Sequence, residues 1–376
     1  MQLEFDKVKT LLAAHCQTAY GKTKAEQLRI HTRLGYIEPE LKQANEYKQL
    51  LQSGIYFPND IVLNLSGELK LLGIPGAVLN EEQFINIRRL AESMKQVFHW
   101  FDAERKIAYP SLLSVVAGSY YEKAIVALID DVLDEYGNVK DNASKELEKI
   151  RIGLIRKRAE LRRVFDRVVA KWNKSGYVSD IEEAFLNGRR VVAVHAEYKR
   201  QVKGILLGES DTRKTSFIEP EETIELNNDV FTLEHEESRE VYRILRDLTK
   251  QLSVYASLLK EYHVIAGEYD FVRGKAKLAM DIGGNYPVVQ DKAHVQLIHA
   301  YHPLLYLYNQ RSGKPVIPVS VTLDEKSRIL VISGPNAGGK TVTLKTVGLL
   351  QMMLQSGLLV PVNPDSQMGI FKQLMI

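Results

Sequence analysis

The chain has 376 residues, a length that suggests two or three domains with sizeable cores. Its 45% hydrophobic and 26% charged residues are ordinary for a globular chain, and its net charge of +3 is too small to indicate nucleic-acid binding by itself. The single cysteine, Cys16, excludes an internal disulfide framework and favours a reducing compartment.

The sequence predicts no membrane segment. No uncharged apolar run approaches the roughly 18 residues of a membrane span. The N-terminus has neither a basic region nor an apolar region of the kind that starts a secretion signal. We therefore expect a cytoplasmic protein without a membrane partner.

Residues 1–140 are expected to form a helical core domain, because short apolar stretches with helical spacing alternate with glycine and proline breaks. No group of Cys or His residues has metal-ligand spacing. His235, which lies among three glutamates, fits a solvated helix face better than a metal site. No catalytic residue can be named from this pattern.

Residues 141–175 are expected to form an ascending lever helix. Its apolar face consists of Leu147, Ile150, Leu154, Leu161, Phe165, Val168 and Trp172. From Lys145 to Lys174 the segment carries eleven Lys or Arg against four Asp or Glu. Such a run fits a solvated helix face and a nucleic-acid contact about equally well.

Residues 176–220 are expected to form a small β clamp. Asn187-Gly188 is a strong hairpin signal, because a type I′ turn needs positive φ at both central residues. Strands are expected at residues 181–185, 189–194, 202–206 and 215–218. The residues expected to contact nucleic-acid phosphates are Arg189, Arg190, Lys199, Arg200, Lys203, Arg213 and Lys214. The competing interpretation is a hairpin insertion whose charges keep it soluble.

Residues 221–285 are expected to form the descending lever helix and the return to the core. The apolar seam consists of Val241, Leu245, Leu248, Leu252, Tyr255, Leu259, Tyr262 and Ala266. Neither proline nor glycine interrupts residues 221–266, so the pattern favours one helix of over forty residues. Two helices of similar length, each with an apolar seam, predict an antiparallel pair packed as in a coiled coil.

Residues 286–376 contain the most informative motif of the chain. It fits G-x-x-x-x-G-K-[ST], the Walker A or P-loop pattern, with residues Gly334, Pro335, Asn336, Ala337, Gly338, Gly339, Lys340 and Thr341. Residues 328–333 are expected to form the buried strand before the loop, and residues 342–355 the helix after it. In that geometry Lys340 would reach the β- and γ-phosphates of ATP, and the Thr341 hydroxyl would bind Mg²⁺.

The acidic residue that P-loop ATPases use to hold Mg²⁺ has no counterpart after the loop. Only 35 residues follow Thr341, and Asp365 lies in a turn-like run. We therefore expect the first, incomplete part of an ATPase domain that does not hydrolyse ATP alone. A P-loop kinase or NTPase with a helical insertion is an alternative, against which the missing acid argues.

Taken together, these features resemble the MutS family, and more specifically its shorter bacterial paralogue MutS-two. The loop is similar to the family's G-P-N-x-x-G-K-[ST], and Tyr301-His302-Pro303 resembles the entry into its ATPase domain. The clamp signature is similar to the segments 187–194, 217–220 and 225–228. Within this resemblance Ser210-Asp211-Thr212-Arg213 departs from the small-residue stretch that is usual in the paralogue.

The resemblance implies a mainly α fold with a small β clamp: a helical core and antiparallel lever helices, followed by the first part of an α/β ABC-type ATPase domain. It implies ATP and Mg²⁺ as cofactors, a homodimer in the full-length protein, and Val316 as an adenine contact. Because no mismatch-reading domain precedes the core, we expect DNA repair or recombination on branched DNA. A ribosome- or RNA-directed module of the same paralogue is the alternative.

Overall fold

The computed structural model describes residues 3–60, 62–334 and 339–375, and it divides into two compact units. One comprises Met1–Lys70, Asn86–Val126 and Tyr255–Ile376, and the other comprises Leu71–Ile85 and Ala127–Val254. The described chain is mainly helical with two four-stranded sheets, which confirms the mainly α class with a small β part. None of its helices is long and apolar enough to cross a membrane.

The first unit is built around α11 (Ala256–Ile282), against which α1 (Phe5–His15), α2 (Ala19–Glu26) and α3 (Leu34–Gln52) pack. Its further helices are α4 (Ser66–Leu71), α6 (Ala103–Ala108), α7 (Pro110–Leu113), α12 (Pro303–Arg311) and α13 (Lys340–Gln355). Two longer helices, α5 (Glu81–Trp100) and α8 (Lys123–Val132), contribute residues to both units, and α4 contributes its last residue, Leu71, to the second.

Small residues and a buried carboxylate hold α2 against α11. Asp270 of α11, 1% exposed, accepts hydrogen bonds from the backbone N–H groups of Gln17 and Thr18, the latter at 2.7 Å, and so caps the start of α2. A Cβ on Gly21 would lie 2.7 Å from an Asp270 carboxylate oxygen, and one on Gly267 would lie 2.4 Å from the Tyr20 ring. Only glycine allows so close an approach of these two helices.

The C-terminal part of the first unit contains a mixed sheet in the order β5-β8-β6-β7. Its strands are β5 (Val288–Gln290), β6 (Val295–Ala300), β7 (Val319–Leu323) and β8 (Gln367–Gly369). Strand β8 pairs parallel with β5 and antiparallel with β6. The second half of α13 is buried in the same hydrophobic core as α1 and α11.

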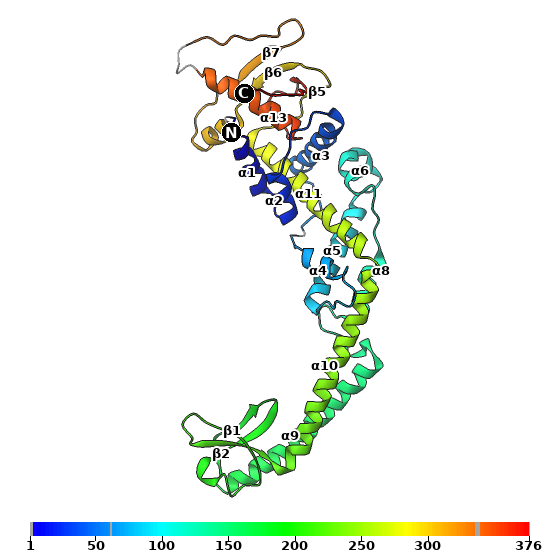
Figure 1. Cartoon of the computed structure of the whole chain (residues 1–376), viewed down its shortest axis with the longest axis vertical. Coiled ribbons are helices and arrows are strands. Elements are labelled where there is room, and N and C mark those ends of the chain that lie inside the picture. The colour runs from blue at the N-terminus through cyan, green and yellow to red at the C-terminus, as the bar shows by residue number, and fades with distance from the viewer. Residues whose placement is uncertain (1–2, 61, 335–338, 376) are drawn as a thin grey trace. The chain divides into compact units, whose positions relative to one another are not determined.

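The second unit contains a helix pair and a second sheet. In Figure 1, α9 (Lys145–Lys174) and α10 (Ile224–Ser253) lie side by side, and the sheet follows the end of α9. Its strands are β1 (Val178–Leu186), β2 (Arg189–His195), β3 (Gly204–Glu209) and β4 (Thr215–Pro220), in the order β1-β2-β4-β3. We call this sheet with its loops, residues 176–220, the clamp.

The expected hairpin is confirmed, because Asn187 and Gly188 have φ of 52° and 77° between the antiparallel strands β1 and β2. Strand β3 begins two residues later than expected, at Gly204. A side chain at this position would meet the backbone oxygen of Glu219 at 2.3 Å, so the strand starts where glycine permits close pairing.

The apolar seam expected along residues 141–175 is confirmed. Leu161, Phe165, Val168 and Trp172 of α9 are all buried, and the last three pack with Val192, Val194 and Ile218 of the clamp. Leu161 joins a second cluster with Val230 of α10. One stripe of α9 therefore packs against the returning helix near its middle and against the clamp near its end.

The expectation of one helix over residues 221–266 is wrong. A short 3₁₀ turn, Glu221–Thr223, precedes α10, and α10 ends at Ser253 before α11 begins at Ala256. Tyr255, with φ −94° and ψ 7°, leaves the helical conformation. The apolar steps continue through this position, so the heptad-like pattern could not reveal the break.

Candidate nucleotide-binding and nucleic-acid-binding sites

The P-loop motif lies at the N-terminus of α13. Gly339 is the N-cap of this helix with φ 80°, and Gly334 has φ 145°, so both positions favour glycine. Pro335, Asn336, Ala337 and Gly338 lie outside the described residues. The helix expected at residues 342–355 is confirmed and starts slightly earlier, at Lys340. The first backbone N–H groups of an α-helix have no acceptor within the helix, which is why helix N-termini are suited to anions.

Lys340 is the first residue of α13, and its ammonium group donates a hydrogen bond to the Gly334 carbonyl oxygen at the other end of the loop. The lysine therefore bridges the two described ends of the motif. Thr341 is exposed beside it. A lysine, a helix N-terminus and a hydroxyl on one loop fit the phosphates and Mg²⁺ of a nucleotide, which remains a prediction for these residues.

The strand expected at residues 328–333 is wrong. The chain is irregular there, and Ile329 and Val331 are 85% and 83% exposed. Strand β7 ends at Leu323, and the Asp324 carboxylate accepts hydrogen bonds from the N–H groups of Lys326 and Ser327, which turns the chain. An apolar run becomes a strand only when neighbours complete its hydrogen bonds, and the described residues place no strand beside it. The P-loop ATPase fold is therefore not confirmed.

Two further residues considered for the nucleotide site, Val316 and Asp365, lie outside the helices and strands. Val316 is half-buried in the segment between α12 and β7, and its adenine contact remains a prediction. Asp365 lies in a turn, as the sequence predicted, and its N–H donates to the Asn363 side chain.

His235 packs edge-on against Phe231, with 4.4 Å between the ring centroids, and the described residues contain no cluster suited to a metal ion.

Arg189, expected to contact nucleic acid, is bonded within the clamp. Its Nη1 donates to both carboxylate oxygens of Glu219 at 2.7 and 2.9 Å, and its Nη2 donates to the Asn228 side chain. Glu219 is 1% exposed and also accepts from the Asn227 amide at 2.8 Å. These contacts join strands β2 and β4 to the first turns of α10.

Arg190 and Lys199 are also engaged. The Arg190 guanidinium lies 4.6 Å above the Phe165 ring and donates to Glu183 at 2.9 Å, with its side chain 13% exposed. Lys199 donates to Glu209 at 2.7 Å, and this hydrogen bond lowers the pKa of the Glu209 carboxyl. A cation held this way must exchange partners to bind a phosphate.

The other four expected contacts have exposed side chains: Arg200, Lys203, Arg213 and Lys214. Lys214 and Arg213 lie in the turn before β4, where the Lys214 carbonyl accepts from the Ala196 N–H at 2.9 Å. Lys203 lies at the opposite end of the sheet, since Gly204 pairs with Pro220 while His195 pairs with Thr215. The clamp therefore does not gather the seven cations into one patch.

The basic helix α9 faces an acidic partner. Arg151 bonds Glu237 at 2.7 Å, Lys157 bonds Asp229 at 2.7 Å, and Arg158 bonds Glu234 at 2.6 Å. These three carboxylates all lie on α10. Part of the positive run thus stabilises the helix pair, an arrangement that periodicity alone does not reveal because it depends on which faces meet.

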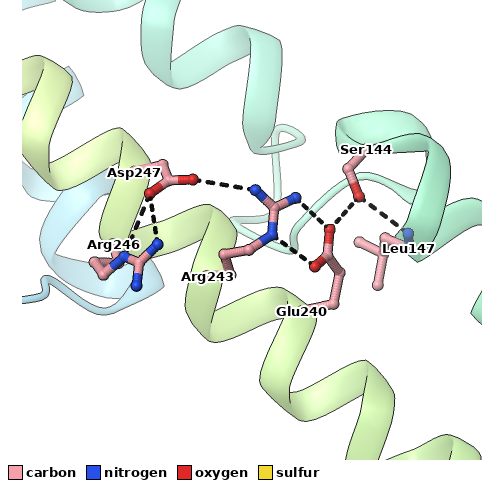
Figure 2. A network of polar contacts seen from close by, with 6 residues as sticks. All are labelled: Ser144, Leu147, Glu240, Arg243, Arg246 and Asp247. Atoms are coloured by element: carbon pink, nitrogen blue, oxygen red, sulfur yellow. Dashed lines mark hydrogen bonds and ion pairs between the residues drawn. The ribbon is translucent and has the colours of Figure 1, made fainter.

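A polar network closes the helix pair near the start of α9, and Figure 2 shows its six residues. Ser144 is the N-cap of α9: its hydroxyl accepts from the Leu147 N–H at 3.0 Å and donates to Glu240 at 2.6 Å. Arg243 donates to both Glu240 oxygens, at 2.6 and 2.8 Å, and to Asp247 at 3.2 Å. Mainly through the bond from Arg243, the pKa of Glu240 falls to about 2.

Glu219 and Asn227 lie in the segments 217–220 and 225–228, which resemble the clamp signature, but the sequence assigned neither residue a role of its own. Glu219 carried a further signal, since it is a carboxylate within the otherwise uncharged strand segment Ser216 to Pro220. Glu240 looks like an ordinary polar residue of an acidic helix, and the sequence did not single it out. The contacts of Asn227 and Glu240 join residues that are 37 and 96 positions apart in the sequence.

The chain thus combines a Walker A sequence motif before α13 with a helix pair, α9 and α10, that carries a small sheet. No protein-family model matches it. Curated relatives named endonuclease MutS2 do: those of Geobacillus sp. strain WCH70 and Aquifex aeolicus strain VF5 are each 30% identical over 374 residues, and that of Staphylococcus aureus strain MRSA252 is 31% identical over 381 residues.

These matches cover 99%, 100% and 99% of this chain but 47%, 48% and 47% of the respective relatives. The chain therefore spans about half the length of the curated relatives it matches. The resemblance to the MutS family, and to its MutS2 branch, is confirmed over nearly the whole chain.

Proposed function

We propose that this chain is a nucleotide-responsive, DNA-binding portion of a MutS-type protein that acts on branched or recombining DNA. The observation that carries the proposal is the similarity to MutS2 proteins over 99% of the chain, which includes both the loop and the clamp. The proposal concerns binding, because the chain spans only 47% of that relative.

ATP with Mg²⁺ is the proposed cofactor. The backbone N–H groups at the start of α13 and the Lys340 ammonium would hold its phosphates, and the Thr341 hydroxyl would be a ligand of Mg²⁺. The bound nucleotide supplies negative charge that Lys340 can pair with in place of the Gly334 carbonyl it contacts here. Val316 is the proposed adenine contact.

Nucleotide binding is proposed to bias the geometry of the lever helices in a homodimer of the full-length protein. A ligand shifts such an equilibrium only if it binds one arrangement more tightly than the other. The γ-phosphate supplies that difference when Lys340 and its loop contact it in one arrangement only.

Electrophoretic binding to linear and four-way branched duplex DNA, at roughly 50 and 200 mM salt, tests the proposal. We expect tighter binding to the branched form and affinity that falls steeply as salt rises, because phosphate contacts release counterions. Salt-insensitive or absent binding contradicts it. Purified ribosomes that displace the DNA would favour the ribosome-directed alternative instead.

A further inference from the structure

The cations of the second unit differ in what they contact. Seven of those that the structure describes are bonded to carboxylates within the unit at 2.5 to 2.9 Å: Arg151, Lys157, Arg158, Arg189, Arg190, Lys199 and Arg243. Using these for phosphate binding would require breaking an existing ion pair. The cations outside such pairs are the ones that can neutralise a polyanion without that cost.

The last turns of α9 carry four such cations, Arg163, Arg167, Lys171 and Lys174, which we call the α9 stripe. All four side chains are exposed. Within the part of the chain that the structure describes, no carboxylate lies at ion-pair distance from them. The carboxylate next to them in sequence, Asp166, is directed toward Arg162 and Arg190, at 3.9 and 4.0 Å.

The α9 stripe lies on one side of the helix. Steps of four, four and three residues keep side chains within one face at 3.6 residues per turn. The same periodicity places the buried residues Phe165, Val168 and Trp172 on the opposite side, where they pack into the clamp core. The stripe thus faces away from the surface that holds the clamp on α9.

The length of the α9 stripe also fits the phosphate backbone of one DNA strand. Arg163 and Lys174 are eleven positions apart in the helix, which at ~1.5 Å per residue is a rise of roughly 16 Å. One DNA strand presents a phosphate about every 3.4 Å of helix axis, so the stripe runs past about five phosphates. Flexible Lys and Arg side chains can reach several of these at once.

We propose that the α9 stripe, rather than the clamp sheet, is the main contact for the phosphate backbone of duplex DNA. The proposal rests on the DNA-binding function proposed above and assigns its surface. Charge complementarity supports it: the four residues of the stripe are all cationic, whereas the exposed Arg213 and Lys214 of the clamp share the turn between β3 and β4 with Asp211, which follows Glu209 at the end of β3. The clamp then stabilises the end of α9 and holds the stripe in place.

The test uses three variants that each replace one exposed Arg and one exposed Lys by Gln. The stripe variant is Arg167→Gln with Lys171→Gln, and the clamp variant is Arg213→Gln with Lys214→Gln. The control on α10 is Arg239→Gln with Lys250→Gln, which are exposed residues of the same unit. Gln is a good helix former, so circular dichroism and thermal unfolding should match among the two helix variants.

For the stripe variant we expect the slope of log affinity against log salt to become shallower by up to about two units. Its affinity for duplex DNA near ~0.1 M salt should fall on the order of 10-fold or more. The α10 control should change neither quantity measurably. The clamp variant should lose less of both than the stripe variant does.

Three results would overturn the assignment. A clamp variant that loses as much slope as the stripe variant, or more, would return the contact to the sheet while leaving the DNA-binding function intact. An RNA duplex of the same sequence that binds more tightly than DNA, and depends on the stripe equally, would change the ligand. Failure of the unmodified chain to bind DNA would end both this inference and the proposed function.

Discussion

Arg189 of strand β2 donates two hydrogen bonds to Glu219 of strand β4, at 2.7 and 2.9 Å, and Glu219 is 1% exposed. A residue that the sequence offers as a DNA contact is therefore the counter-ion of a buried carboxylate. Removing one partner of a buried pair leaves an uncompensated charge, which is costly.

We therefore predict that Arg189→Ala lowers the free energy of unfolding by about 2 kcal/mol. This is below the roughly 3–5 kcal/mol of fully buried pairs, because the Arg189 side chain keeps 26% exposure. Urea unfolding of the variant, compared with Arg239→Ala at an exposed position of α10, measures it. Equal stability of the two variants would show that the pair does not stabilise the clamp.

The Glu240 network predicts a pH dependence. Its pKa is lowered from 4.5 to about 2, chiefly by the hydrogen bond from Arg243, so the charged form stabilises the folded state. That contribution is fully present above about pH 4.5 and is lost as pH falls toward 2. We expect Glu240→Gln to be less stable than the unmodified chain at pH 6, with the difference shrinking between pH 4.5 and 2.

Urea unfolding of both proteins at pH 6, 4 and 3 measures this difference. Asp134→Asn is a suitable control, because backbone hydrogen bonds, from Asn138 foremost, lower the pKa of this exposed carboxyl without a link between the two helices. A difference for Glu240→Gln that stays constant across these pH values would contradict the role given to the ionised carboxylate.

Close helix packing gives a third prediction. A Cβ on Gly267 in α11 would lie 2.4 Å from the Tyr20 ring, so Gly267→Ala should destabilise the first unit by about 1–3 kcal/mol. Gly153 in α9 is the matched control: its nearest neighbour would be a Leu233 methyl at 3.7 Å. Gly153→Ala should stabilise by about 0.5–1 kcal/mol through helix propensity.

Thermal unfolding of the two glycine variants measures both effects. Opposite shifts of the midpoint support the packing described for α2 and α11. If both variants gain stability, a side chain at position 267 fits beside Tyr20 and close packing at Gly267 does not hold α11 against α2.

Local signals in the sequence predicted local structure well. Asn187-Gly188 specified its hairpin because positive φ at both positions is a property of the dipeptide itself. The seam from Leu147 to Trp172 specified α9, because one apolar stripe must be buried wherever the helix packs. The helix expected after the P-loop motif, at residues 342–355, is present as α13, which begins two residues earlier at Lys340.

Features that depend on a distant partner were not predicted. Residues 328–333 have the composition of a strand, but a strand also needs neighbours, and Val331 is 83% exposed. The break at Tyr255 leaves the apolar spacing intact, so the pattern runs through it. The sequence showed how many cations the clamp carries, but only the contacts separate Arg189, which is bonded to Glu219, from exposed cations such as Arg213.

Nucleotide binding by the loop before α13 can be measured on the chain itself. The purified chain is titrated with a fluorescent ATP analogue and Mg²⁺, in parallel with Lys340→Ala. We predict saturable binding that the variant loses, because Lys340 would contact the β- and γ-phosphates. Equal binding by both proteins, or binding by neither, would contradict it.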